Sequence, residues 1–168
     1  MDSTHWHLLL NHFPIIGTIL GAGVMAYGYF AQSEPTKKAA LLTWIVMALV
    51  AIPVLLTGEP TEESVENLAG VSEAIIGQHE EAAELAFWVM EALGVFALFA
   101  FFIKGKSVRK AVVGATFALS FATFGLMAYT GYLGGQIRHT EIRSDAAAQT
   151  PTEQGSEKDD DESAEKKK

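Results

Sequence analysis

The sequence AAELAFWVMEALGVFALFAFFI occupies residues 82–103 and is apolar apart from Glu84 and Glu91. A helix crosses a bilayer core of about 30 Å with roughly 20 apolar residues. This stretch therefore predicts a transmembrane helix. Glu91 lies near its middle, where a carboxylate costs roughly 2.5–3.5 kcal/mol on insertion scales. A carboxylate at that depth usually faces a partner, a cavity or a cofactor.

Three further stretches of the chain are long, apolar and free of charged residues. They cover residues 13–31, 39–58 and 111–136 of the 168-residue chain. Together the four stretches predict an all-α fold, an antiparallel bundle of four transmembrane helices built in the lipid bilayer. We expect a membrane domain over residues 1–143, with helices over about residues 12–31, 39–58, 79–103 and 108–136.

Two polar segments lie outside the predicted spans. In residues 61–76, Val65, Leu68, Ile75 and Ile76 recur at approximately helical intervals. This pattern predicts a short amphipathic helix on the membrane surface between the second and third spans. Residues 144–168 contain charged and small polar residues with nothing to bury, so we expect a disordered C-terminal tail that is acidic and ends in lysines.

Among the three connections between the predicted spans, only two contain lysine or arginine. Residues 32–38 and 104–110 carry six of them, whereas residues 1–12 and 59–81 carry none. Excess basic residues mark the cytoplasmic side of a membrane protein. The sequence therefore predicts a multi-pass protein of the bacterial cytoplasmic membrane with both termini on the periplasmic side. The outer face is then acidic.

The histidines fall beside the outer ends of the predicted spans. They are His5, His7, His12, His79 and His139. Imidazole is a common metal ligand and the usual axial ligand of non-covalent haem. Three interpretations remain open. His12 and His79 would hold haem b, with His139 or His7 as replacements; His12, His79, Glu80 and Glu84 would hold a transition metal; or the histidines cap helices and bond to carboxylates.

Three carboxylates of the third span share one helix face. Glu80, Glu84 and Glu91 are separated by four and seven residues. Counting inward from the outer ends of the third and fourth helices sets Glu91 opposite Thr123, whose hydroxyl would satisfy the carboxyl group. The other interpretation is a proton path from mid-membrane to the outer surface through the three carboxylates.

Small residues of the first span indicate close helix packing. Gly17 and Gly21 form a Gly-x-x-x-Gly pair, a spacing that lets two helix backbones approach each other. We expect this packing to be intramolecular, and a dimer contact is the alternative. Pro14 is expected in the first turn of the same helix, with Asn11 or His12 as the capping residue.

The start His7-Leu8-Leu9-Leu10-Asn11-His12-Phe13-Pro14 resembles that of a bacterial family of four-helix membrane proteins of unknown function. Members of that family have Thr-Gly at the end of the second helix, a histidine at the start of the third, and a Gly-Gly pair followed by a histidine. The matching positions here are Thr57-Gly58, His79, Gly134-Gly135 and His139. The resemblance covers roughly residues 5–142. It implies the fold and membrane placement and a suspected redox role, without naming a ligand.

These observations favour a membrane electron-transfer module that holds haem b near the outer surface. Its partners would be quinol or a periplasmic redox carrier. The alternative is a non-enzymatic subunit that anchors or assembles a larger membrane complex and whose histidines are structural. No phosphate-binding loop, nucleophile triad or basic stripe is present, so the sequence predicts no nucleotide or nucleic-acid partner. The chain contains no cysteine, which excludes thiolate ligands and c-type haem attachment.

Overall fold

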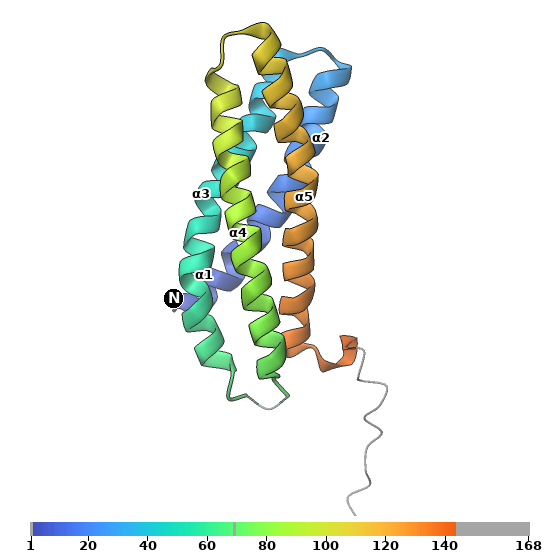
Figure 1. The fold of residues 1–168 in the computed structure, drawn as a ribbon. Coiled ribbons are helices and arrows are strands. Elements are labelled where there is room, and N and C mark those ends of the chain that lie inside the picture. The colour runs from blue at the N-terminus through green and yellow to red at the C-terminus, as the bar shows by residue number, and fades with distance from the viewer. Residues whose placement is uncertain (1, 69, 144–168) are drawn as a thin grey trace, which may run out of the picture.

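The computed structural model describes residues 2–68 and 70–143, and this part of the chain is all-helical, with no strands. The predicted tail at residues 144–168 lies outside the described residues. The helices are α1 (Ser3–Leu10), α2 (His12–Phe30), α3 (Glu34–Val65), α4 (Glu73–Phe102) and α5 (Lys106–Arg138), followed by a 3-10 turn, η1 (Thr140–Ile142) (Figure 1).

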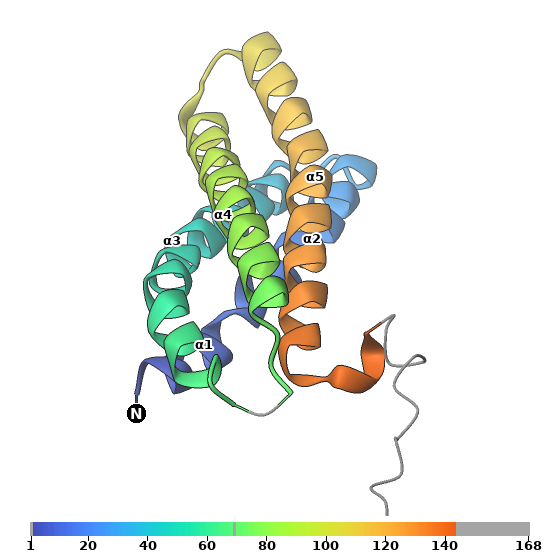
Figure 2. The same ribbon diagram turned by 60° about the horizontal axis from the view of Figure 1, so that its bottom comes forward.

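Four long helices form a closed bundle. Each of α2 and α4 packs against both α3 and α5, so α2 and α4 lie on one diagonal of the bundle and run in the same direction. The short helix α1 packs mainly on α3 (Figures 1 and 2). We call the end with the α2–α3 and α4–α5 connections the basic end, and the end with the α3–α4 connection the acidic end.

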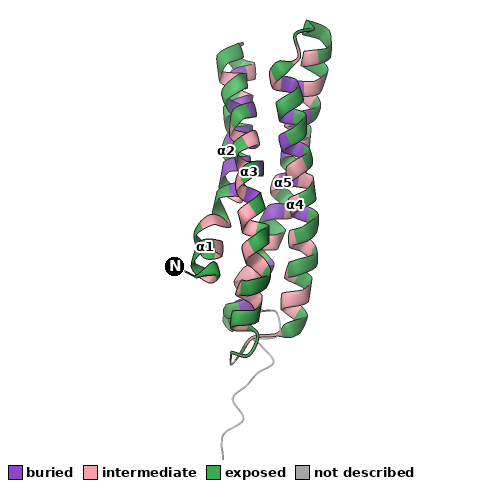
Figure 3. Cartoon of the chain, turned by 90° about the vertical axis from the view of Figure 1, so that its left-hand side faces the viewer, coloured by how far each residue is buried: buried purple, intermediate pink, exposed green. Residues whose placement is uncertain are grey.

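The surface of the bundle matches an apolar environment. Four helical stretches, with α1 and α2 counted together, are long and apolar enough to cross a membrane. Large apolar side chains such as Phe30, Leu56 and Phe102 point outward with 70–89% of their surface exposed. Buried residues follow the inward faces of the helices in Figure 3. The chain is thus compatible with a multi-pass membrane protein, as the sequence predicts.

Small residues let α2 approach α3 around a buried tryptophan. Trp44 is fully buried, and its Nε1 donates a hydrogen bond to the Thr18 carbonyl at 3.1 Å. Gly21 lies against the Trp44 ring, and Gly17 lies against Met47 of the same helix. The Gly-x-x-x-Gly pair therefore serves the intramolecular contact that we expected. Without side chains at these two positions, the indole reaches a main-chain carbonyl and leaves no unpaired N–H in the core.

The predicted amphipathic helix over residues 61–76 is wrong. Residues 61–65 continue α3, and residues 73–76 form the first turn of α4. Pro60 does not end α3, although it cannot donate a backbone hydrogen bond. Hydroxyl groups support the helix here, because Thr57 donates to the Pro53 carbonyl at 2.7 Å and Thr61 donates to the Thr57 carbonyl at 2.6 Å.

The helix ends also differ from the predicted limits. Both α3 and α5 extend beyond their apolar segments, because helical hydrogen bonding continues where the environment becomes polar. Because α4 begins at Glu73, His79 lies in the second turn of this helix rather than at its start. Pro14 occupies the first turn of α2 as expected, whereas Asn11 precedes that helix without a side-chain capping bond. The structure also has a helix, α1, over residues 3–10, where none was expected from the sequence.

Replacing Gly21 with alanine is expected to lower the free energy of unfolding by about 1–3 kcal/mol, because overpacking strains a filled core. The added Cβ would lie 2.5 Å from Trp44 Nε1 and would force the indole away from its acceptor. Unfolding in mixed detergent micelles measures the change. Gly23→Ala is the matched control, since nothing lies within 4 Å of a Cβ there. Equal stability of the two variants would contradict the packing described here.

Candidate functional site

The site begins with a break between α1 and α2 at Asn11. Proline has no N–H group, so Pro14 leaves the Leu10 carbonyl without its helical partner. The short helix α1 leaves the line of α2 at this point and lies beside the acidic end of α3 (Figure 3). The Asn11 N–H still donates to the His7 carbonyl at 2.9 Å, so the connection is tight.

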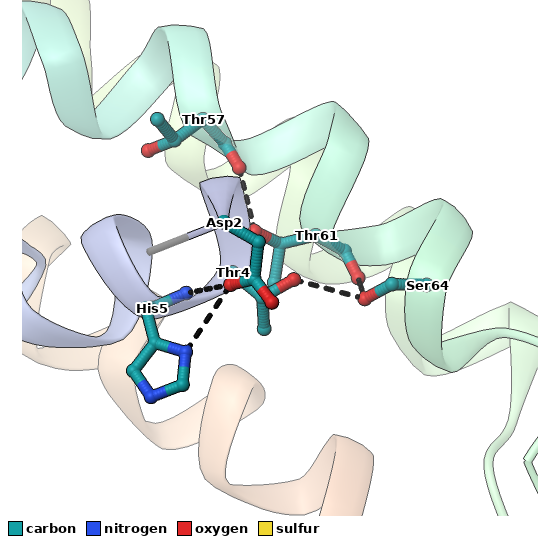
Figure 4. A network of polar contacts seen from close by, with 6 residues as sticks. All are labelled: Asp2, Thr4, His5, Thr57, Thr61 and Ser64. Atoms are coloured by element: carbon teal, nitrogen blue, oxygen red, sulfur yellow. Dashed lines mark hydrogen bonds and ion pairs between the residues drawn. The ribbon is translucent and has the colours of Figure 1, made fainter.

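Hydroxyl groups hold α1 against α3. Thr4 and Ser64 share a hydrogen bond of 3.1 Å between the two helices, and Ser64 donates to the Thr61 carbonyl at 2.6 Å (Figure 4). Asp2 caps α1 by accepting from the His5 N–H at 2.9 Å. The backbone and side-chain hydrogen bonds from His5 lower the pKa of the Asp2 carboxyl. These contacts fix the side of α1 that faces the bundle.

His7 faces α3 from the middle of α1. Its ring is half-buried, and its Nδ1 lies 3.1 Å from the Val54 carbonyl oxygen. Because a carbonyl only accepts, Nδ1 must carry the proton. The Thr57 hydroxyl lies 3.4 Å from the same nitrogen. Gly58 leaves room for the ring, since a Cβ at that position would lie 3.7 Å from His7 Cε1.

His79 lies on the inward face of α4 and contacts α5. The same face carries Ala86 and Met90, which are buried. His79 Nδ1 lies 3.0 Å from the Thr130 carbonyl oxygen, so this nitrogen is also the protonated one. Gly134 makes room for the imidazole, because a Cβ there would come within 3.0 Å of Cε1. His79 thus repeats on α5 the arrangement that His7 has on α3.

The two rings form a pair at the acidic end of the bundle. His7 is held by the Val54 carbonyl near the acidic end of α3, and His79 is held by the Thr130 carbonyl near the acidic end of α5. With Nδ1 protonated, each ring keeps an unprotonated Nε2, and no described residue hydrogen-bonds to either Nε2. Neither Nε2 is fully buried. Two nitrogen lone pairs are therefore free to bind a ligand.

Asn11 contributes a further polar group to the acidic end of the bundle. From the sequence it was expected only as a helix cap. Its Oδ1 is buried and has no hydrogen-bond partner among the described residues. It follows His7 by four residues and precedes the buried Thr18 by seven, so it lies on the inward face of the chain. The Thr18 hydroxyl reaches the sulfur of Met90 across the bundle at 3.5 Å. The four-residue spacing between His7 and Asn11 is the feature of the sequence that could have indicated that the two residues share a helix face.

The histidine pair lies about one hydrocarbon thickness from the basic end. Thr57 follows Lys38 by 19 residues on α3, and Thr130 follows Lys110 by 20 residues on α5. At 1.5 Å per residue, both spacings correspond to about 30 Å, the thickness of a bilayer core. The residues that hold His7 and His79 are thus at the depth where the far side of an apolar layer would end.

The other histidines lie apart from this pair. His12 is exposed at the start of α2, although the sequence analysis named it with His79 as the first haem ligand. His139 is exposed after α5, where its Nδ1 lies 2.8 Å from Glu141. Hydrogen bonds from its own N–H and from His139 lower the pKa of the Glu141 carboxyl. The structure thus holds His7 and His79 against helix carbonyls at the acidic end and leaves His12 and His139 exposed.

The predicted set of metal ligands is not assembled in the described residues. Glu80 and Glu84 are exposed on α4, and His12 is exposed on α2. No three histidine, aspartate or glutamate side chains in the described part of the chain are grouped closely enough to hold a metal ion.

Glu91 has no hydroxyl partner, contrary to the sequence-based expectation. Its Oε1 is buried and accepts no hydrogen bond from a described residue. The Thr123 hydroxyl donates instead to the Leu119 carbonyl of its own helix at 3.0 Å. Hydroxyl groups in apolar helices commonly bond to the carbonyl four residues earlier, and this local bond is made without moving a helix.

A carboxylate cluster lies nearer to the surface at the acidic end. Glu80 and Glu84 follow the same side of α4 as Glu91 and are exposed. Glu62 of α3 experiences the like charges of Glu80 on α4 and Glu59 on its own helix. Carboxylates of α3 and α4 thus both contribute to the acidic end.

Comparisons with known proteins identify no relative. The chain matches no protein-family model, no curated protein and no solved structure. The family resemblance at residues 7–14 therefore stays a prediction.

Replacing Glu91 with leucine is expected to raise the free energy of unfolding by about 1–3 kcal/mol, the cost of an unpaired buried polar group. Unfolding in mixed micelles measures the change. Leu93→Ala, at a fully buried position of the same helix, is the control and should destabilise. A Glu91→Leu variant that unfolds more easily than the wild type would show that the carboxyl group has a stabilising partner.

Proposed function

We propose that the chain is a membrane electron-transfer module that holds haem b between His7 and His79. The observation that carries this proposal is the paired geometry of the two imidazoles. Each ring donates from Nδ1 to a helix carbonyl and keeps a free Nε2. This is the arrangement in which histidine ligates iron, because the hydrogen bond fixes the tautomer and the ring orientation.

The residues present fit the group in number and in kind. A porphyrin supplies four nitrogens of its own, so two histidines from different helices complete the coordination of its iron. His7 comes from α1 and His79 from α4, and the buried Asn11 oxygen is a polar atom still without a partner. Gly58 and Gly134 make room for the two imidazole rings themselves.

The chain supplies position and protection to this site. Haem, when bound, would accept and release one electron at a time. His7 and His79 would hold it at the acidic end, within reach of a quinol at the membrane boundary or of a redox carrier outside the bilayer. The half-buried setting of both rings limits access by water. With both histidine ligands neutral, their Nδ1–H bonds to the Val54 and Thr130 carbonyls persist in either redox state.

Protons would accompany the electrons along α4. The support is Glu91, whose carboxyl group lies within an apolar segment with a buried, unpartnered oxygen. Buried polar groups of this type are costly and mark proton pathways in membrane proteins. Glu84 and Glu80 continue from it to the exposed cluster at the acidic end. In this proposal the three carboxyl groups exchange protons between mid-membrane and the outer surface.

The basic end of the bundle would face the bacterial cytoplasm, and both termini would be periplasmic. All lysines and arginines of the two short connections lie at that end, which is the distribution that orients membrane proteins. The histidine pair and the carboxylates would then face the periplasm. A subunit that anchors a larger complex through the acidic end is the competing function.

Purified protein expressed with sufficient haem is expected to show a Soret band, and reduction is expected to sharpen its visible bands. His7→Ala and His79→Ala should each lower the haem content at least about tenfold, because one lost ligand costs 10-fold or more in affinity. His12→Ala and His139→Ala are the controls and should keep the spectrum. Haem-free protein, or equal loss in all four variants, would leave the anchoring function as the better account.

Single cysteines provide the orientation test, because the chain has none of its own. Asn67→Cys at the acidic end and Ser107→Cys at the basic end are both at exposed positions. A membrane-impermeant maleimide is expected to label Asn67→Cys on intact spheroplasts and to label Ser107→Cys only after lysis. The opposite pattern would invert the proposed topology.

A further inference from the structure

The structure points to a lipid-binding site at the basic end, independent of the histidine pair. We propose that the phosphate of an anionic phospholipid binds at the junction of α2, α3 and α5. Its partners are Lys37 and Arg109, which now share the carboxylate of Glu34. The lipid phosphate competes with this carboxylate for the two cations.

Charge at the basic end is strongly unbalanced. Residues 31–38 and 103–110 contain one acidic residue, Glu34, against six basic residues: Lys37, Lys38, Lys104, Lys106, Arg109 and Lys110. An anionic headgroup near the ends of membrane helices is attracted by such clusters, and basic pockets between helices bind lipid phosphates. The imbalance selects a negatively charged lipid over a zwitterionic one.

The three residues at the junction come from two helices, since Glu34 and Lys37 lie on the first turn of α3 and Arg109 lies on α5. Lys37 Nζ lies 3.0 Å from Glu34 Oε1, and Arg109 Nη1 donates to the other carboxylate oxygen. The two cationic side chains are only 15% and 17% exposed, whereas Glu34 is 53% exposed. Lys37 and Arg109 carry two positive charges and Glu34 carries one negative charge, so the group has a net charge of +1. A phosphodiester has one negative charge, so it would neutralise the group.

Arg109 has binding capacity that Glu34 does not use. Its Nη2 is buried and has no hydrogen-bond partner in the described part of the chain. A guanidinium group presents its N–H groups in a planar fork that matches two oxygens of a phosphate. Exchange of Glu34 for a phosphate, with a turn of the Arg109 side chain toward the surface, would allow both Nη atoms to be paired.

The surroundings favour a lipid over a free phosphate ion. The Lys37 ammonium group lies 4.8 Å from the centroid of the Tyr29 ring, which holds it at the edge of α2. Phe30, the last residue of α2, is 89% exposed and offers an apolar surface to an acyl chain. Headgroup and acyl chain thus have separate partners at the same helix end.

Native mass spectrometry of the full chain in detergent with added lipid tests the proposal. Wild-type protein should retain phosphatidylglycerol, which is anionic, at least about fivefold better than phosphatidylcholine, which is zwitterionic. Arg109→Gln should remove this preference. Lys104→Gln is the matched control, because it removes one positive charge from the same end at an exposed position outside the junction, and it should keep most of the preference.

Glu34→Gln separates lipid binding from a purely structural ion pair. Without the competing carboxylate, the preference for phosphatidylglycerol should increase by about fivefold, corresponding to one additional unpaired cation. A structural role alone predicts that Glu34→Gln and Arg109→Gln lose lipid together. That outcome, or equal retention of the two lipids by the wild type, would overturn the proposal. Displacement of the lipid by millimolar inorganic phosphate would overturn the assignment to a lipid and leave a phosphate-ion site.

Discussion

The missing N–H group of Pro14 is the constraint on which the candidate site depends. It leaves the Leu10 carbonyl without a helical partner where α1 ends, and the chain turns at Asn11 while keeping the hydrogen bond to the His7 carbonyl. The bundle consequently has three long helices and one that is divided in two. Only a divided helix brings a residue five positions before the start of α2 to the side of α3, where His7 finds the Val54 carbonyl.

His7 and His79 make the same kind of contact, from Nδ1 to a helix carbonyl, but they are carried by different kinds of helix. His79 is carried by a continuous helix and needs only a gap on α5, which Gly134 provides. His7 is carried by a short helix that has no buried residue of its own. Its position therefore depends on polar contacts such as Thr4 with Ser64. A hydrogen-bonded helix end is easier to displace than a packed one, so His7 is the more adjustable member of the pair.

The helical bundle could be predicted from the sequence because four apolar segments and two basic connections are compatible with few helix arrangements in a bilayer. The candidate site at the acidic end could be predicted only in part. The sequence indicated that histidines gather at one end, yet it named His12, which is exposed, ahead of His7, whose Nδ1 contacts the Val54 carbonyl. Spacing along the chain cannot show that α1 leaves the line of α2. The carbonyl acceptors on α3 and α5 were equally hidden, since every residue has a carbonyl group.

The misjudged residues share one physical cause, which is competition between local and distant hydrogen bonds. Thr123 was expected to serve Glu91, but a hydroxyl on a helix reaches its own carbonyl four residues earlier without any cost in packing. The hydroxyls of Thr57 and Thr61 do the same and carry α3 past Pro60. In an apolar bundle these local bonds are made first, and carboxyl groups such as Glu91 are left without partners.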